Sequence, residues 1–134
     1  MTIGDLLRRL APLDPDEPLV IPHNRWPYLA GTWGSYRGYY DELMLEGERR
    51  DCGHNTVGGL RALLESALRA GTMTGYKGGE YPIRRYTRVW LGEYGDSDGA
   101  VVGAPMRLGD RWYLLVAPPD AGDNVAEDYA EPTP

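Results

Sequence analysis

Three consecutive strand-like segments near the C-terminal end of the chain constrain the fold more than any other feature. They cover residues 87–91, 100–108 and 111–117, and no helix-forming segment lies between them. Gly109-Asp110, between the last two, is a favoured two-residue hairpin turn. A doubly wound sheet needs strands that alternate with helices, so these segments favour an antiparallel arrangement instead.

The first predicted helix runs from Thr2 to Leu10, with its apolar residues on one face. Thr2 is the expected N-cap, and Asp5 three residues later makes a variant of the capping box. Pro12 ends the helix, because the residue before a proline avoids helical backbone angles.

The second predicted helix begins at Thr56 as its N-cap and ends before Gly71. An apolar stripe at helical spacing makes it the clearer of the two helices. Gly58 and Gly59 in its first turn are poor helix formers, so the position of its start is less sharply defined.

The other segments are shorter. Residues 19–21 predict a short strand, and residues 36–45 predict a longer one. Residues 23–34 are rich in turn-forming residues and predict a loop, and residues 46–55 are polar and predict an exposed connection. The expected fold class is therefore α+β: an antiparallel sheet of five to six short strands with two helices packed on one face.

Domain organisation follows from length and composition. The 134 residues contain no apolar run long enough to span a membrane, and we expect a single α+β domain over residues 1–117. Residues 118–134 contain five acidic residues and no basic ones, and predict a disordered acidic tail. The start of the chain does not resemble a signal peptide. A single cysteine, Cys52, excludes an internal disulfide and is consistent with the cytoplasm.

Charge is unevenly distributed along the chain. The net charge of −6 falls to about −1 when the tail is set aside, with 14 basic residues against 15 acidic ones. This balance argues against attraction to an extended nucleic acid. Residues 76–88 instead carry four basic side chains and only one acidic one, which suits a local site for one small anion.

The first candidate binding motif, Ser35 to Leu43, covers most of the predicted 36–45 strand from its start. Successive side chains of a strand alternate between its faces, so Arg37, Tyr39 and Asp41 share one face. Arg37 and Asp41 lie about 13 Å apart along a strand, too far to pair, so they either bracket a ligand or pair with neighbouring strands. Tyr36 adds another ring for stacking on a base.

A second candidate motif, residues 74–81, contains the same residue types among glycines: Tyr76, Lys77, Glu80 and Tyr81. Lys77 is the only lysine beside thirteen arginines, which suggests a point charge kept for an anion. The alternative is a solvated lysine at a hairpin tip. The tyrosines are either stacking platforms or core residues in a chain that has no phenylalanine.

Motifs for enzymes and metals are missing from the sequence. His23 and His54 are isolated, and Cys52-Gly-His54 lacks a second ligand pair for zinc. Asp96 to Gly99 resembles the start of a calcium loop without the later glutamate. No Walker loop, dinucleotide fingerprint or nucleophile elbow is present. We therefore expect no catalytic residues, no metal and no cofactor.

The two motifs also carry a resemblance. The chain resembles a family of small phage and prophage proteins in four stretches. These are Ser-Tyr-Arg-Gly-Tyr-Tyr-Asp-Glu-Leu (35–43), Thr-Val-Gly-x-Leu (56–60), Gly-Tyr-Lys-Gly-Gly-Glu-Tyr (75–81) and Val-Trp-Leu-Gly-Glu-Tyr-Gly (89–95). The likeness extends from about residue 2 to 103. It departs from the family at Met44, where the family has a small residue, and after Gly103.

What this resemblance implies is an anti-defence role. Small phage proteins of this type include homo-oligomeric sponges that bind, without cleaving, the cyclic or ADP-ribose-derived nucleotide signals of bacterial immune systems such as Thoeris. In that case Arg37 and Lys77 hold phosphates, Tyr39 and Tyr76 stack, and Asp41 or Glu80 accepts ribose hydroxyls. Two alternatives stay open: a small phosphodiesterase or glycohydrolase acting on such a nucleotide, and a structural or protein-interaction factor without a small-molecule ligand.

Overall fold

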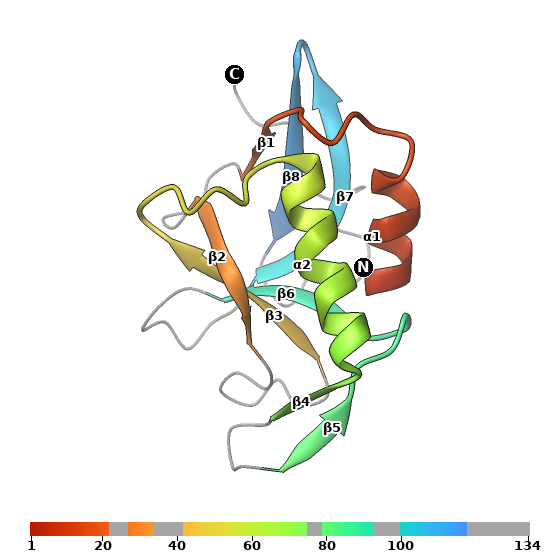
Figure 1. Cartoon of the computed structure of the whole chain (residues 1–134). Coiled ribbons are helices and arrows are strands. Elements are labelled where there is room, and N and C mark those ends of the chain that lie inside the picture. The colour runs from red at the N-terminus through yellow and green to blue at the C-terminus, as the bar shows by residue number, and fades with distance from the viewer. Residues whose placement is uncertain (22–26, 34–41, 75–78, 93–99, 118–134) are drawn as a thin grey trace.

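The computed structural model describes residues 1–21, 27–33, 42–74, 79–92 and 100–117. It is an α+β fold, as predicted, with two helices over a curled six-stranded sheet and a separate two-stranded sheet (Figure 1). The elements in chain order are α1 (Ile3–Leu10), β1 (Leu19–Val20), β2 (Tyr28–Trp33), β3 (Leu43–Glu48), α2 (Val57–Ala70), β4 (Thr72–Thr74), β5 (Glu80–Pro82), β6 (Val89–Gly92), β7 (Ala100–Leu108) and β8 (Arg111–Ala117).

The large sheet is mixed rather than wholly antiparallel. Its strand order is β1-β8-β7-β6-β3-β2, and the pairs β1–β8 and β3–β6 are parallel. The hairpin of β7 and β8 turns at Gly109-Asp110 as predicted, with Gly109 at φ 63°. A parallel pair needs a crossover connection, and α2 lies in the one between β3 and β6.

Two of the sequence predictions were wrong. β2 forms within the predicted 23–34 loop, and β3 continues to Glu48, into the segment predicted to be an exposed connection. The two strands pair with each other, with a register shift between Leu29 and Gly31. Pairing with a neighbouring strand therefore outweighs the local turn propensity of this stretch.

Asn55 fastens the start of α2 to two strands. Its side-chain amide donates to Pro27 O at 2.8 Å and accepts from Leu29 N–H at 2.7 Å, and its carbonyl accepts from Leu19 N–H at 3.0 Å. Hydrogen bonds of this kind contribute roughly 1 kcal/mol each. One residue thus connects β2 to β1 beside the start of α2.

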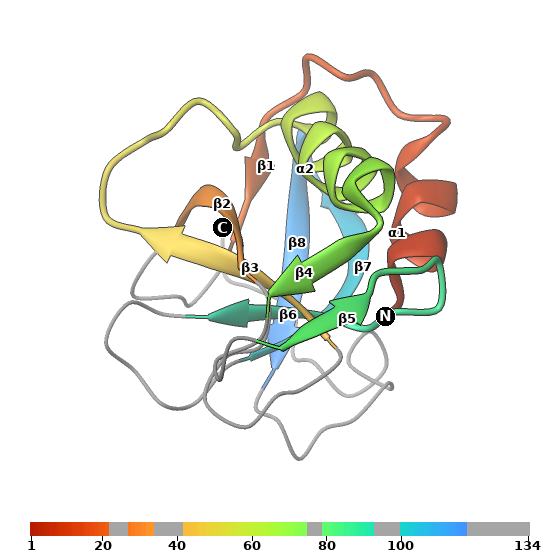
Figure 2. The same ribbon diagram turned by 60° about the horizontal axis from the view of Figure 1, so that its bottom comes forward.

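The hydrophobic core lies between the helices and one face of the large sheet. Alternate residues of the strands point into it, as Leu43 and Leu45 do in β3 and Val89 and Leu91 do in β6. The helices cover that face together, as predicted and as the view in Figure 2 shows. Their fully buried contributions are Ile3, Leu6 and Leu10 from α1 and Val57, Leu60 and Leu64 from α2.

Neither helix among the described residues has the length and apolar character that a membrane crossing requires.

Candidate functional site

Most of the predicted binding residues lie outside the described residues. These are Tyr36, Arg37, Tyr39, Asp41, Tyr76 and Lys77. Residues 118–134, the predicted tail, also lie outside them. The structure places only Glu80 and Tyr81 of the predicted set.

Glu80 and Tyr81 are neighbours in β5, so their side chains lie on opposite faces of the strand. Glu80 is exposed, whereas Tyr81 is only 8 % exposed and packs in the core. The Tyr81 hydroxyl donates a hydrogen bond to Glu42 O at 2.7 Å. Glu42 belongs to the first motif and Tyr81 to the second, so the described ends of the two motifs are in contact although they are far apart in the chain.

The basic stretch that the sequence indicated divides into three arginines with different surroundings. Arg84 donates to the carbonyls of Ile83 and Gly71, at 2.9 and 3.0 Å, and so closes the C-terminal end of α2. Arg88 lies over the Trp90 ring, 5.5 Å from its centroid. Arg85 alone of the three lines a groove on the surface.

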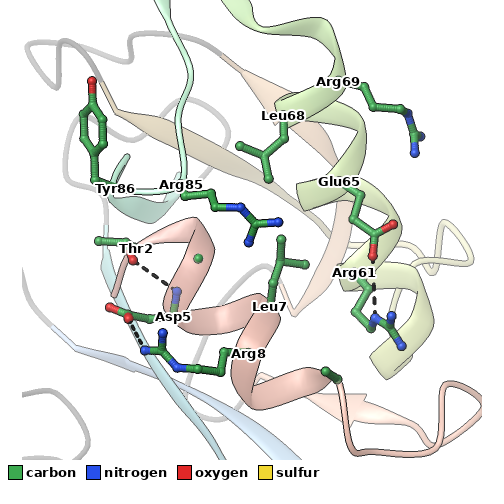
Figure 3. A pocket seen from close by; sticks show the side chains of 12 residues that line it. Thr2, Asp5, Leu7, Arg8, Arg61, Glu65, Leu68, Arg69, Arg85 and Tyr86 are labelled. Atoms are coloured by element: carbon green, nitrogen blue, oxygen red, sulfur yellow. Dashed lines mark hydrogen bonds and ion pairs between the residues drawn. The ribbon is translucent and has the colours of Figure 1, made fainter.

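This groove, which we call the basic groove, lies between α1, α2 and the turn at residues 84–87, and encloses about 880 Å³. Its charged rim consists of Arg8, Arg61, Arg69 and Arg85, with Asp5 and Glu65 as its acidic members. Figure 3 shows the Arg85 guanidinium directed between Leu7 of α1 and Leu68 of α2. The site thus combines a cation with an apolar floor.

The backbone of the Arg85 turn is fixed by the first turn of α1. Ile3 N–H donates to Thr87 O at 2.9 Å, and Gly4 N–H donates to Arg85 O at 2.8 Å. Within the turn, Arg84 N–H donates to the Thr87 hydroxyl at 2.9 Å. The bonds from Ile3 and Gly4 satisfy helix N–H groups that have no partner inside the helix. The start of α1 therefore positions Arg85 instead of binding an anion itself.

A glycine permits this close contact. A Cβ atom at Gly4 would lie 3.2 Å from Arg85 O and 3.3 Å from Arg85 Cβ, tighter than ordinary packing. Gly4 therefore lets the turn approach the helix closely enough for the hydrogen bond to form. Tyr86, the next residue of the turn, is 74 % exposed and stands at one end of the groove with its hydroxyl pointing away from it (Figure 3).

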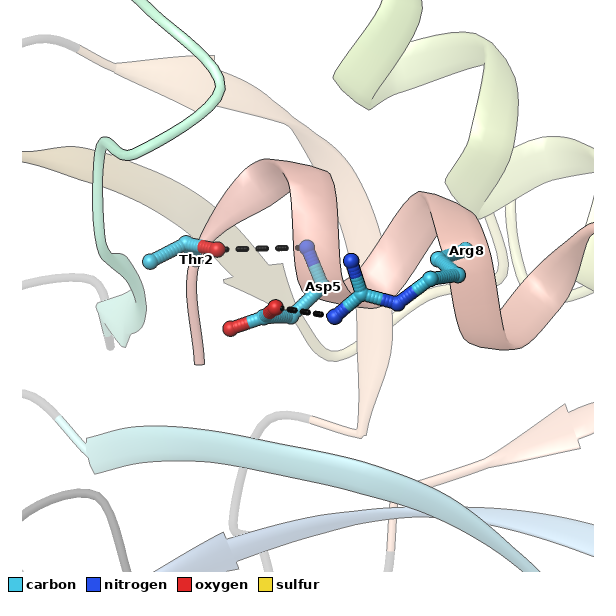
Figure 4. Close-up of polar contacts among 3 residues, drawn as sticks. All are labelled: Thr2, Asp5 and Arg8. Carbon is cyan, nitrogen blue, oxygen red and sulfur yellow. Dashed lines mark hydrogen bonds and ion pairs between the residues drawn. The ribbon is translucent and has the colours of Figure 1, made fainter.

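Two of the four arginines are already paired with carboxylates. Arg8 forms an ion pair with Asp5 (Figure 4), and Arg61 Nε lies 3.7 Å from Glu65 Oε1. Within the part of the chain that the structure describes, Arg69 and Arg85 form no ion pair. The groove therefore carries two positive charges that no carboxylate of the described residues neutralises.

Thr2 and Arg8 act together on Asp5. The Thr2 hydroxyl accepts from Asp5 N–H at 3.1 Å. Hydrogen bonding from Thr2, opposed by partial burial and assisted by Arg8, lowers the pKa of the Asp5 carboxyl below its usual 3.8. Asp5 therefore stays ionised at neutral pH, where it holds Arg8 along the helix surface.

The groove has the chemistry of a binding site for an anion with an apolar part. Guanidinium groups bind phosphate and carboxylate through charge-assisted hydrogen bonds, and the leucines accept a ring or a methylene chain. The described residues include no cluster of three or more histidine, cysteine or acidic side chains placed to hold a metal ion. The positive excess at residues 76–88 was a signal for this groove, but it did not distinguish Arg85 from its neighbours.

Comparison of the chain with models of known protein families, with curated proteins and with solved structures finds no match.

Proposed function

We propose that this protein binds a small phosphate-bearing nucleotide in the basic groove and sequesters it without cleaving it. The observation that carries the proposal is the placement of Arg85. The turn that carries it is held by two hydrogen bonds from α1, to Arg85 O and Thr87 O, its guanidinium points into the groove, and no described carboxylate neutralises it. The backbone that carries the guanidinium is therefore already ordered before a phosphate binds, which lowers the entropic cost of binding.

The size and lining of the groove support the same ligand class. A volume of about 880 Å³ is within the range of small-molecule sites, roughly 300–1,000 Å³. Leu7 and Leu68 offer an apolar surface for a base or ribose, and Tyr86 offers an exposed ring at one end. Stacking of a base on an aromatic ring contributes about 1–3 kcal/mol.

The resemblance of the two motifs supports a more specific proposal, that the ligand is a cyclic or ADP-ribose-derived immune signal. The protein would then act as a phage anti-defence factor in the cytoplasm of the infected bacterium, as a homo-oligomer. Arg37, Tyr39, Asp41 and Lys77 would contribute to the same ligand or to a second copy of it. Native mass spectrometry of protein purified from cells that produce such signals tests the bound mass and the subunit count together.

The test of the groove is a binding measurement with ADP-ribose and cyclic ADP-ribose by isothermal titration calorimetry. Arg85→Ala removes a charge-assisted contact that contributes about 1.5–3 kcal/mol, so we expect the affinity to fall by about tenfold or more. Arg9→Ala is the matched control. Arg9, in α1, is an exposed arginine like Arg85, but it does not line the groove. Equal affinities for the wild type and Arg85→Ala would place the ligand elsewhere.

Sequestration is tested by recovery of the ligand. The complex is heat-denatured, and the released nucleotide is analysed by liquid chromatography and mass spectrometry. We expect the intact nucleotide in an amount equal to that bound. Recovery of a hydrolysed product would show instead that the protein is a phosphodiesterase or glycohydrolase.

A further inference from the structure

The basic groove and the C-terminal segment of the chain have complementary charges. The groove carries four guanidinium groups against two carboxylates. Residues 118–134 carry five carboxylates and no basic side chain. The two other long stretches without lysine or arginine, residues 10–24 and 89–106, carry only three acidic residues each. Opposite charges of this size favour association at moderate ionic strength.

The apolar part of the groove is matched as well. Glu127, Asp128 and Glu131 flank Tyr129 in the C-terminal segment, so an aromatic ring lies among carboxylates. Leu7 and Leu68 line the groove beside Arg85, so apolar side chains lie among guanidinium groups there. A segment of this pattern places its ring on the leucines while its carboxylates reach the arginines.

The sheet brings the start of the C-terminal segment close to the groove. Ala117, the last residue of β8, pairs with Val101 of β7, and the next residue of β7, Val102, accepts a hydrogen bond at 2.8 Å from the amino group of Met1. Thr2 already lines the groove. The spacing of strands and the length of a residue put Thr2 roughly 15–20 Å from Ala117 along this path. Residue 127 follows Ala117 by ten residues, which can extend to roughly 33 Å, so residues 127–131 reach the groove without strain.

We propose that the basic groove is the docking site of the chain's own acidic segment, with residues 127–131 placed against Arg85, Leu7 and Leu68. The docked segment occupies the surface that a phosphate-bearing ligand would use. It therefore competes with that ligand and prevents indiscriminate binding of weak anions. The docking itself rests on the groove and on charge, and it holds whether or not the ligand is a nucleotide.

The docking is tested by paramagnetic relaxation in the full-length chain. A nitroxide is attached at Thr133→Cys in a Cys52→Ser background, and the protein is otherwise labelled with ¹⁵N. We expect loss of peak intensity at amides of the groove, such as those of Asp5, Leu7 and Arg85, and none at Gly109 in the hairpin turn. The loss should disappear at high salt.

Two variants show whether charge drives the docking. One neutralises the segment by Asp120→Asn, Asp123→Asn, Glu127→Gln, Asp128→Asn and Glu131→Gln; the other is Arg85→Glu, with Arg69→Glu as a second variant if Arg85→Glu does not give a well-dispersed spectrum. In both variants the amide peaks of the groove should regain the intensity that the nitroxide removes in the wild type. The variant with the neutralised segment should also bind inorganic pyrophosphate several-fold more tightly than the wild type in calorimetry. Equal affinities for the two proteins would show that the segment does not compete for the groove.

Three results would overturn the proposal. Groove peaks unaffected by the nitroxide would show that the segment is not there. Broadening that survives neutralisation of the segment would show that charge does not place it. Broadening seen only when a nitroxide-labelled chain is mixed with a ¹⁵N-labelled chain would assign the docked segment to a second copy. Absence of nucleotide binding would leave these results unchanged, so the two proposals fail separately.

Discussion

The first turns of α1 and α2 use the same device for different ends. Each helix has a threonine N-cap: Thr2 accepts from Asp5 N–H at 3.1 Å, and Thr56 accepts from Gly59 N–H at 2.9 Å. In each, the next two N–H groups donate to carbonyls of a distant segment. For α1 the segment is residues 85–87, and for α2 it is residues 15–17.

A glycine lies at the closest contact in both cases. Gly4 of α1 faces Arg85, and Gly58 of α2 faces Pro15. The difference is in what the docked segment carries. Residues 85 and 86 present an arginine and an exposed tyrosine to the basic groove, whereas residues 15–17 connect α1 to β1 and line no part of that groove. One arrangement therefore fixes the chain path, while the other also positions a charged side chain for binding.

The largest expected effect is on the α2 side, at Gly59. A Cβ atom there would lie 2.4 Å from His54 O, so the backbone has to shift. We expect Gly59→Ala to lower the free energy of unfolding by about 3 kcal/mol. Urea unfolding followed by circular dichroism measures this. Gly31→Ala is the control, because its Cβ would meet nothing within 4 Å, and its effect should stay within about 0.5 kcal/mol.

Gly58→Ala and Gly4→Ala compare the two docked segments directly. A Cβ at Gly58 would lie 3.0 Å from Pro15 Cβ, and one at Gly4 would lie 3.2 Å from Arg85 O. Alanine gains up to about 1 kcal/mol of helix propensity, so we expect Gly58→Ala to cost about 1 kcal/mol and Gly4→Ala to be nearly neutral. Only Gly4→Ala should weaken nucleotide binding in calorimetry, because it displaces Arg85. Weakened binding in Gly58→Ala would contradict the division of roles.

The two caps give effects of intermediate size. We expect Thr56→Ala and Thr2→Ala each to lower the free energy of unfolding by about 1 kcal/mol, because each removes the acceptor of a helix N–H group. Thr2→Ala should also raise the pKa of Asp5, because it removes the hydrogen bond that lowers this pKa. Thr56→Ala has no such second effect, because the residue that Thr56 caps is Gly59, which has no carboxyl group. Carboxyl carbon shifts in an NMR titration report this pKa, and an unchanged value would rule out the role given to Thr2.

The smallest expected effect is the pH dependence that Asp5 adds. Its pKa is lower in the folded protein than the usual 3.8, so its contribution is fully present above pH 3.8 and is lost as the pH falls through the folded pKa. The Asp5 side chain is 40 % exposed, which limits the contribution to a few tenths of a kcal/mol. The difference in unfolding free energy between wild type and Asp5→Asn should therefore vanish in acid. A difference that persists at pH 2 would contradict this origin.

Local features of the fold were predictable because their causes are local. Thr2 and Thr56 begin their helices, Gly71 at φ 76° ends the second, and Gly109-Asp110 turns the β7–β8 hairpin. Each depends on residues within a few positions. The start of α2, by contrast, looked doubtful because of its glycines, and the structure explains them by contacts with Pro15 and His54 that lie outside the helix.

Long-range pairing was not predictable from sequence pattern alone. The parallel pairs β1–β8 and β3–β6 join segments distant in the chain, and β2 forms because Asn55 and β3 hold a stretch with many turn formers. The same limit applies to the site. The positive excess around residue 85 was visible, but hydrogen bonds from α1 decide which arginine faces the groove, and most of the predicted motif residues lie outside the described residues.

The parallel pairing of β1 with β8 has a consequence for how the chain folds during synthesis. Leu19 pairs with Trp112, so one edge of the sheet forms between an early and a late segment. A ribosome must release nearly the whole domain before this edge exists, and contacts of such long sequence separation slow folding. Nascent chains that stop before β8 lack the core residues Leu114 and Val116, so they should expose the apolar side chains that these residues cover and depend on chaperones.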